Sequence, residues 1–185
     1  MWWRVVPSPV VGGGVVLACA PKNAPVYAVR AGGEGTLGAD ALAWASEGRR
    51  NPVTSDVPTP AFDGSRFYVL SDLAESLSRV HPATGAVEWT TELPGKARWR
   101  GSPTVADGKV WCVNHAGLVV VVDAESGAIL ARNDLGGEED DQVRSSVAAA
   151  HGSLFLRARR TLYCFASAPA PADGAEPEPP VRDGR

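Results

Sequence analysis

Residues Ser102 to Leu130 read SPTVADGKVWCVNHAGLVVVVDAESGAIL. In this stretch short apolar runs alternate with turn sequences, first Asp107-Gly108 and later the Asp-x-x-Ser-Gly segment from Asp123 to Gly127. Short Val-rich and Trp-containing runs bounded by such turns predict β-strands joined by tight hairpins. The question is whether this stretch is a unique pair of hairpins or one copy of a repeat.

The same pattern recurs at a fixed spacing. Gly64, Gly108 and Gly152 lie 44 residues apart, and Phe67, Trp111 and Phe155 repeat at the same spacing. The β-rich runs that the three glycines open are RFYVL from Arg66, KVWCV from Lys109 and SLFLR from Ser153. The stretch is therefore one copy of a repeat, and the repeat decides the fold class.

Each copy begins and ends in a similar way. A short segment that runs up to each of these glycines begins each copy and is called its lead below. The leads are TPAFDG at Thr59, SPTVADG at Ser102, SSVAAAHG at Ser145 and, less regularly, SPVVGGG at Ser8. Downstream, Leu77 to Trp89 aligns with Val119 to Ala131, and Leu162 to Phe165 aligns with Leu118 to Val121. Each unit thus predicts four short antiparallel strands.

Units of about 40 to 45 residues that each form one small sheet are typical of propeller blades, which bury their faces against neighbouring blades. The sequence predicts an all-β chain, a β-propeller arc of about three full four-stranded blades plus a partial fourth. We expect a repeat domain over residues 1–166, with blades at 7–57, 58–101, 102–144 and 145–166. Residues 167–185, rich in Pro, Ala and acids, predict a disordered tail.

The repeats resemble the PQQ-like (pyrroloquinoline-quinone-type) β-propeller family, whose blades carry a pattern close to Ala-x-Asp-x-x-Thr-Gly-x-x-x-Trp. The matching residues are Thr84, Gly85 and Trp89 in one copy, Asp123, Ser126 and Gly127 in the next and, more loosely, Ala28, Gly33 and Trp44 in the first. His81 stands where Asp is expected, Arg79 where Ala is expected, and Ala131 replaces Trp. The resemblance covers roughly Pro7 to Ala166.

The resemblance implies structural roles for these residues, because in the family the Thr-Gly turn and the Trp dock neighbouring blades. We expect Gly64, Gly108 and Gly152 to serve the turns as well. The chain is closest in style to BamB-type non-catalytic envelope propellers, which implies a protein partner and a periplasmic or cell-envelope location. Family propellers usually close with seven or eight blades, so we expect a C-terminal part of a larger repeat protein.

The quinone enzymes of the same superfamily use a calcium or lanthanide ion, an acidic base and often a vicinal disulfide. The sequence has no adjacent cysteine pair, since Cys19, Cys112 and Cys164 are widely spread. We therefore assign no catalytic, cofactor-binding or metal-binding residue. A segment of a quinone-dependent dehydrogenase and a carbohydrate- or ligand-binding propeller stay as alternatives.

Composition narrows the class of partner. With 44% hydrophobic and 21% charged residues and a net charge of −3, the chain has the make-up of a soluble globular domain without the basic excess that nucleic acids require. Pro and Gly interrupt every apolar run, so we expect no transmembrane segment. Val16 to Cys19 loosely resembles a lipobox, but Pro7, Pro9 and a Gly triplet break the apolar stretch before it.

Several other motifs favour structural readings. Gly33, Gly35 and Gly38 imitate a dinucleotide fingerprint, but a hairpin repeat follows instead of a βαβ unit. The acidic run from Glu138 to Asp141 lacks the spacing of a Ca²⁺ loop, and no ligand spacing joins the three histidines. These histidines are His81, His115 and His151.

One cluster is a candidate interface. Arg98, Trp99 and Arg100 precede the third unit, and Arg and Trp are typical anchors of protein interfaces. The alternative is that Trp99 packs beneath a loop. The sequence thus predicts a non-catalytic scaffold for protein binding, and the open edges of an arc predict self-association.

Overall fold

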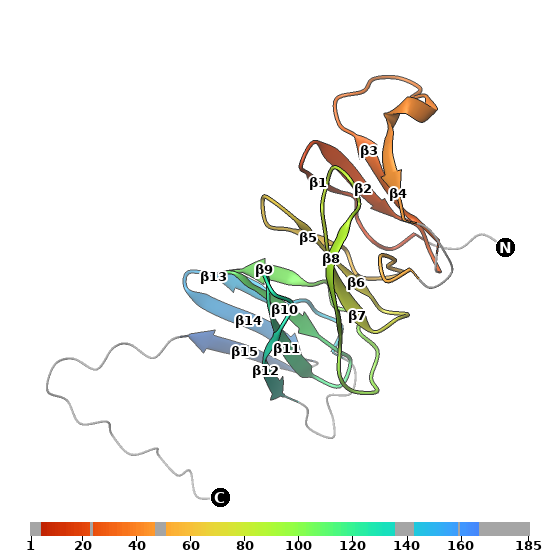
Figure 1. Cartoon of the computed structure of the whole chain (residues 1–185). Helices are drawn as coiled ribbons and strands as arrows, with labels where there is room; N and C mark the ends of the chain where they lie inside the picture. Colours follow the sequence, from red (N-terminus) through yellow and green to blue (C-terminus); the bar gives the residue numbers. More distant parts are fainter. Residues whose placement is uncertain (1–4, 23, 47–50, 136–142, 159, 167–185) are drawn as a thin grey trace, which may run out of the picture.

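The structure, a computed structural model, describes residues 5–22, 24–46, 51–135, 143–158 and 160–166. Four antiparallel sheets follow one another along the chain, and in each the strand order is the chain order (Figure 1). The first sheet contains β1 (Val10–Gly12), β2 (Val15–Cys19), β3 (Val26–Arg30) and β4 (Leu42–Ala45), with the short 3-10 helix η1 (Ala39–Ala41) before β4. The second contains β5 (Ala61–Phe62), β6 (Phe67–Ser71), β7 (Ser76–Val80) and β8 (Val87–Glu92). The third contains β9 (Thr104–Ala106), β10 (Lys109–Val113), β11 (Leu118–Asp123) and β12 (Ile129–Asp134), and the fourth contains β13 (Ala148–Ala150), β14 (Ser153–Ala158) and β15 (Thr161–Ala166).

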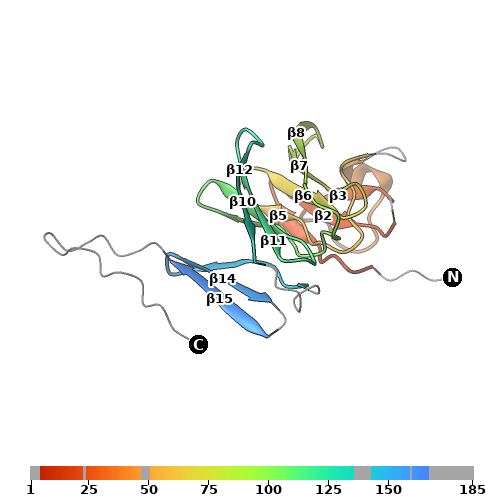
Figure 2. The ribbon, with the colours of Figure 1, turned by 90° about the horizontal axis from the view of Figure 1, so that it is seen from below.

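The sheets stand side by side as in a propeller. The first strands of successive sheets contact one another, β1 with β5, β5 with β9 and β9 with β13, so they form one side of the arc. Figure 2 shows the sheets succeeding one another, with β14 and β15 set somewhat apart. The prediction of an all-β propeller arc of four-stranded sheets with a partial fourth is confirmed. Within the described residues no helix is long and apolar enough to cross a membrane.

Hairpin chemistry sets the turn of each blade. Asp107 and Gly108 both have positive φ, as do His151 and Gly152, which is the geometry of a two-residue type I′ hairpin. The second sheet has a wider turn, in which only Gly64 has positive φ. There the Asp63 carboxylate accepts backbone N–H bonds from Ser65 and Arg66, and these bonds lower the pKa of Asp63 to about 2 against the opposing effect of burial.

In the second and third sheets alternate residues of the strands contribute to a core on either side of the sheet, and in the first and fourth sheets one side does so. Leu17 and Val69 belong to the core between the first and second sheets, and Tyr68 and Val110 to the core between the second and third. A third core between the third and fourth sheets includes Val119 and Leu156. Phe67 and Tyr68 are adjacent yet lie in different cores, as strand alternation requires.

A tryptophan on one sheet lies against a glycine of the next at two junctions. Trp44 on β4 contacts Gly85, and Trp89 on β8 contacts Gly127. A Cβ atom on either glycine would come within 2.6 and 2.7 Å of the respective ring. The Trp44 indole N–H also donates to the Pro82 carbonyl at 2.7 Å. Because both glycines have positive φ as well, the turn needs Gly for its backbone and for the space it leaves.

The four leads form a hydrogen-bond ladder across the sheets. The backbone N–H of Ser8 donates to the Thr59 hydroxyl at 3.0 Å, and that of Thr59 donates to the Ser102 hydroxyl at 3.0 Å. The backbone N–H of Ser102 in turn donates to the Ser146 hydroxyl at 2.9 Å. A small hydroxyl residue in each lead therefore ties each sheet to the next.

One sequence prediction, the alignment of the last strand, needs correction. The alignment of Leu162 with Leu118 was wrong by one residue, because the β14–β15 turn is shorter than the β10–β11 turn. Phe155 pairs with Cys164 as Trp111 pairs with Val121, so Leu162 is level with Val119. The predicted tail and the acidic run from Glu138 to Asp141 lie outside the described residues, and the blade boundaries stay a prediction.

The two kinds of glycine give a direct test of the tryptophan contact. Gly127→Ala should lower the free energy of unfolding by roughly 2 to 5 kcal/mol, because it combines a left-handed backbone with a clash against Trp89. Gly64→Ala is the matched control, because it has positive φ but open space around it, and it should lose only about 1 to 2 kcal/mol. Urea unfolding of both variants measures the difference; equal losses would contradict a packing role for the glycine.

Candidate functional site: a basic rim between the second and third sheets

The predicted interface cluster lies in the linker between β8 and β9, but its three residues differ in exposure. Trp99 is fully buried and belongs to the core between the second and third sheets, together with Leu93 and Cys112. Arg98 is exposed and Arg100 is half-buried. The tryptophan thus packs beneath the linker and anchors it, which leaves the two arginines to face outward from the core.

Arg100 lies near a buried carboxylate of the second sheet. Its Nε atom is 3.9 Å from Asp72, whose side chain is only 2% exposed. Asp72 follows β6 directly, and its carboxylate accepts the backbone N–H of Asp56 at 3.0 Å. Burial raises the pKa of Asp72, although this hydrogen bond and the Arg100 charge act in the opposite direction. Arg100 therefore lies close to the β6–β7 turn, beside the Asp72 carboxylate.

His115 joins the β8–β9 linker to the β12–β13 linker. The surface around it, formed by Arg98, Arg100 and Arg144, is called the basic rim below. The backbone N–H of His115 donates to the Arg98 carbonyl at 2.9 Å, and its carbonyl accepts from the Val143 N–H at 2.9 Å. The preceding Asn114 is buried and organises the turn, since its side-chain oxygen accepts the N–H groups of Ala116 and Leu118. These bonds fix the loops of the rim on the rigid sheets.

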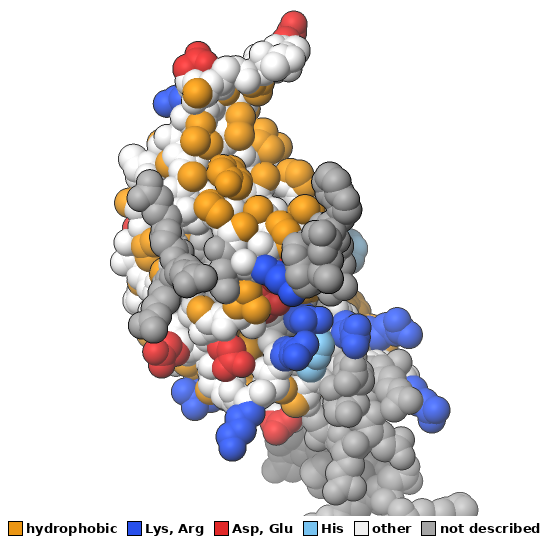
Figure 3. Space-filling view, turned by 90° about the vertical axis from the view of Figure 1, so that its right-hand side faces the viewer, with side chains coloured by type: hydrophobic (Ala, Val, Ile, Leu, Met, Phe, Trp, Pro, Cys, Tyr) orange, Lys and Arg blue, Asp and Glu red, His pale blue; other side chains and the backbone are white. Residues whose placement is uncertain are grey.

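The rim is electropositive around the histidine. Burial lowers the pKa of His115, and the charges of Arg144, Arg100 and Arg98 lower it further. Figure 3 shows Lys and Arg side chains and a histidine gathered below the apolar face of the first sheet. Arginine guanidinium groups on fixed loops suit the recognition of carboxylates. This arrangement can bind an acidic partner surface.

The described residues do not bring together a metal-binding set. No three His, Cys, Asp or Glu side chains among them are placed to hold a metal ion. His81 lies in the β7–β8 turn, where its Nδ1 accepts the Ala83 N–H at 3.3 Å, and His151 lies in the β13–β14 turn. Burial raises the pKa of the Cys19 and Cys112 thiols to about 12, so these thiols stay protonated.

Five of the predicted docking residues lie in or beside the turns between third and fourth strands. Trp89 lies on β8, and Gly64, Gly108 and Gly152 lie in the turns between first and second strands. Asp123 accepts the Ser126 N–H and hydroxyl at 2.7 Å each, bonds that lower its pKa, and Gly127 contacts Trp89. In the second sheet Thr84 accepts the Ala86 N–H at 3.3 Å beside Gly85. These contacts agree with turn-building roles, and the inference that these residues serve structure alone stays our proposal.

Sequence reasoning missed Arg79, which the family pattern showed only as a departure from Ala. Its guanidinium lies 3.2 Å from Glu88 in its own sheet and 2.7 Å from Glu125 in the third sheet. It also donates to the Glu125 carbonyl at 3.1 Å, and the Glu125 hydrogen bond raises the pKa of Arg79. Arg79 thus bridges two sheets. The available signal was a charged residue inside a run that aligns with Val119 to Ala131.

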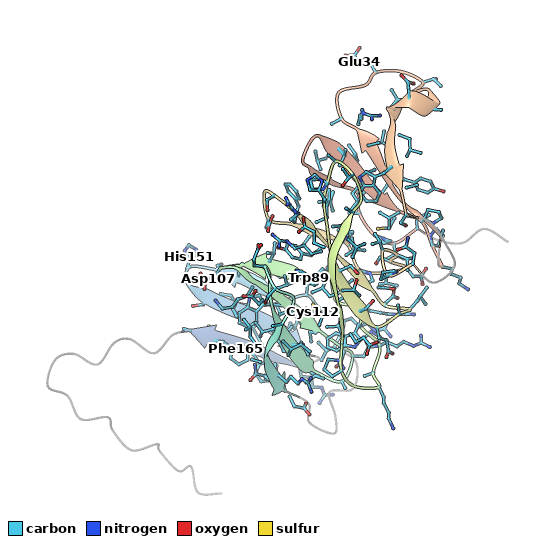
Figure 4. All side chains as sticks on the ribbon, in the orientation of Figure 1. Glu34, Trp89, Asp107, Cys112, His151 and Phe165 are labelled. Carbon is cyan, nitrogen blue, oxygen red and sulfur yellow. The ribbon has the colours of Figure 1, made fainter. Side chains whose placement is uncertain are left out.

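A second feature is a cavity between the third and fourth sheets. It has a volume of about 520 Å³ and is lined by Trp111, Leu154 and Phe165 among others. Ala131 occupies on β12 the register position that Trp89 occupies on β8, so this junction has no tryptophan at that position. Figure 4 shows Phe165 on β15 beside the third sheet, and Trp89 at the junction of the second and third sheets.

Comparisons with known proteins agree on the architecture. The family model described as "Outer membrane protein assembly factor BamB" matches residues 37–167. BamB from Moraxella catarrhalis superposes with a TM-score of 0.62 at 14% identity, covering 85% of this chain and 44% of that chain. Quinohemoprotein alcohol dehydrogenase from Comamonas testosteroni superposes with a TM-score of 0.63 at 17% identity, covering 84% of this chain and 29% of that chain. No curated protein matches in sequence.

The solved structures also include a designed protein. The computationally designed Ika4 protein superposes with a TM-score of 0.64 at 14% identity, covering 90% of this chain and 99% of that chain. The chain thus spans less than half of the natural BamB and dehydrogenase chains, and nearly all of the designed one. At these identities the likeness concerns the fold.

The half-buried position of His115 beside three arginines predicts a pH effect on stability. Its pKa in the folded protein lies below the ordinary value of 6.5, so below about pH 6.5 the unfolded chain binds more protons and stability falls. His115→Gln should therefore reduce the loss of stability between pH 7 and pH 5, measured by urea unfolding at both values. His151→Gln, at an exposed turn, is the control and should keep the wild-type dependence; the same dependence in H115Q would contradict the assignment.

Proposed function

Because the chain belongs to the BamB family of PQQ-like repeat propellers, we propose that it is a non-catalytic scaffold that binds another protein through its basic rim. The single observation that carries the proposal is the exposed Arg98 and half-buried Arg100 on either side of the buried Trp99. Loops held on rigid sheets are where propellers place their binding residues. The proposed location, the bacterial cell envelope, rests on the family description.

The chemistry of the rim suggests the kind of partner. Arg98 is exposed, and Arg100 and Arg144 lie close enough to lower the pKa of the same histidine. A concentration of positive charge on a chain of net charge −3 favours a partner segment that presents Asp or Glu side chains. By family description, we propose that this partner is a component of outer-membrane protein assembly.

The arginines can be tested by charge reversal. Arg98→Glu combined with Arg100→Glu should weaken binding to the outer-membrane assembly proteins of the same organism at least tenfold, mainly through slower association, and should flatten the salt dependence. Biolayer interferometry at two salt concentrations measures both quantities. Lys109→Glu is the matched control, because Lys109 begins β10 beside Asp107 in the β9–β10 turn and should leave binding unchanged.

Two results would count against the proposal. If the wild-type chain binds none of these proteins, the rim is not a partner site of this kind. If the K109E variant loses affinity as much as the double variant does, general charge, and not the rim, controls binding.

The rival function is that of a segment of a quinone-dependent dehydrogenase, which the likeness to quinohemoprotein alcohol dehydrogenases favours. The described residues fit such a cofactor poorly, since they lack a cluster of three metal-ligating side chains, and the sequence has no adjacent cysteines. Carbohydrate or ligand binding rests on fold analogy, with the cavity beside Trp111 as its best place.

Cofactor binding gives a separate test. Addition of pyrroloquinoline quinone with Ca²⁺ should leave the melting temperature of the chain unchanged, because a ligand stabilises a protein only through a site in the folded state. A saturable rise in melting temperature, measured by differential scanning fluorimetry, would favour the dehydrogenase reading over the scaffold.

A further inference from the structure

The outer faces of the first and fourth sheets have complementary chemistry and geometry. We propose that two copies of this chain close a ring, in which the outer face of the β1–β4 sheet of each copy packs on the outer face of the β13–β15 sheet of the other. This inference concerns surfaces away from the basic rim and does not depend on the proposed function. Four observations carry it.

The outer face of the first sheet is apolar across all four strands. The strand registers place four side chains in one row, namely Val11, Val16, Val29 and Leu42. A second row consists of Ala18, Tyr27 and Ala45. Val11 is 67% exposed, and Tyr27 and Leu42 are about 40% exposed. Figure 3 shows this face as a continuous gathering of hydrophobic side chains.

Such a surface is what the other sheets bury. On β2 the alternate residues Val15, Leu17 and Cys19 face inward and belong to the core with the second sheet. The corresponding side of the second sheet, which faces the first, contributes Phe67 and Val69 to that core. The outer face of the first sheet is thus apolar in the same way as the face by which the second sheet packs against the first.

The outer face of the fourth sheet is the matching half. Leu154 and Leu156 face the third sheet, so Phe155 between them points outward, level with Cys164 on β15 and Ala148 on β13. Phe155 corresponds to Trp111 and, by the strand register, to Tyr68 instead of Phe67, which the 44-residue spacing alone had aligned with it. Trp111 and Tyr68 lie on the faces that pack against the following sheet, whereas Phe67 faces the preceding one.

Two further residues complete this face. Leu162 is 66% exposed on it, opposite Arg157 in the register. Arg157 is exposed and is the last residue but one of β14, next to the β14–β15 turn, where a long side chain can reach water at the margin of an interface.

The hydrogen-bond ladder of the leads has two open ends of opposite kind. Ser8 donates its N–H to Thr59, and among the described residues nothing donates to the Ser8 hydroxyl. At the other end the Ser146 hydroxyl accepts from Ser102, and no described residue accepts the Ser146 N–H. An N–H of Ser146 from one copy and a hydroxyl of Ser8 from the other would continue the same ladder.

The number of copies follows from directionality and length. A contact between two different faces is heterologous, and it stays finite only if the rotation closes. The chain covers 44% of BamB from Moraxella catarrhalis with the same sheet arrangement, so two copies supply about the length of that propeller. Two copies would bury both open faces in two equivalent interfaces.

The first experiment is size-exclusion chromatography with light scattering on the full chain at two concentrations. We expect a mass twice the 19.3 kDa of the chain at the higher concentration. Val11→Glu and Leu162→Glu each place a charge on one of the two faces, and each should give a monomer with an unchanged circular dichroism spectrum. Leu73→Glu is the matched control, since Leu73 is 47% exposed in the β6–β7 turn, and it should stay a dimer.

Mixing the two variants distinguishes the proposed pairing of unlike faces from a dimer in which two like faces pair. V11E retains the fourth-sheet face and L162E retains the first-sheet face, so an equimolar mixture should recover a species of twice the monomer mass through one intact interface. If Val11→Glu unfolds the chain, Tyr27→Glu replaces it on the same face. A wild-type monomer at both concentrations, or a mixture that stays monomeric, would overturn the proposal.

Discussion

The contact between a tryptophan ring and a glycine of the next sheet is the constraint on which the arc depends. At Gly85 and Gly127 the chain turns with positive φ and without a side chain, and Trp44 and Trp89 occupy the space left. The turn of one sheet therefore determines how closely the previous sheet approaches. At the third junction, where Ala131 stands in the register position of the tryptophan, the core includes Val119 and Leu156, and a cavity lies between the sheets. This junction therefore rests on its apolar core without the tryptophan contact.

The linkers between sheets divide their residues between core and surface. Trp99 is buried in the core of the second junction, whereas Arg98 beside it is exposed. The tryptophan fixes the linker, and the backbone bonds of His115 join it to the next turn. The backbone that carries this basic surface therefore has little conformational entropy to lose on binding. The junction that stabilises the fold therefore also preorganises the candidate binding residues.

The repeat was visible in the sequence because its signals are local. An Asp-Gly pair, a Thr-Gly turn and an alternating apolar run each describe a few consecutive residues, and the 44-residue spacing joins them. The contacts of Asp72 with Arg100 and of Arg79 with Glu125 join residues 28 and 46 positions apart, and no local pattern encodes them. The register of β15 was misplaced for a related reason, because it depends on the length of a turn and the side-chain pattern alone fits two alignments.

A repeat protein of this kind has a direction. Every junction in the arc joins a face of one type to a face of another, and each lead donates its N–H to the hydroxyl of the following lead. An open row of such units always leaves one outer face on its first sheet and another on its last sheet. It also leaves one unused acceptor and one unused donor at the ends of the hydrogen-bond ladder, and only a closed ring removes both. The apolar row from Val11 to Leu42 is therefore the expected consequence of a directional junction, as is the open face around Phe155. The same sequence rule that builds each internal contact specifies the surface that satisfies the open ones.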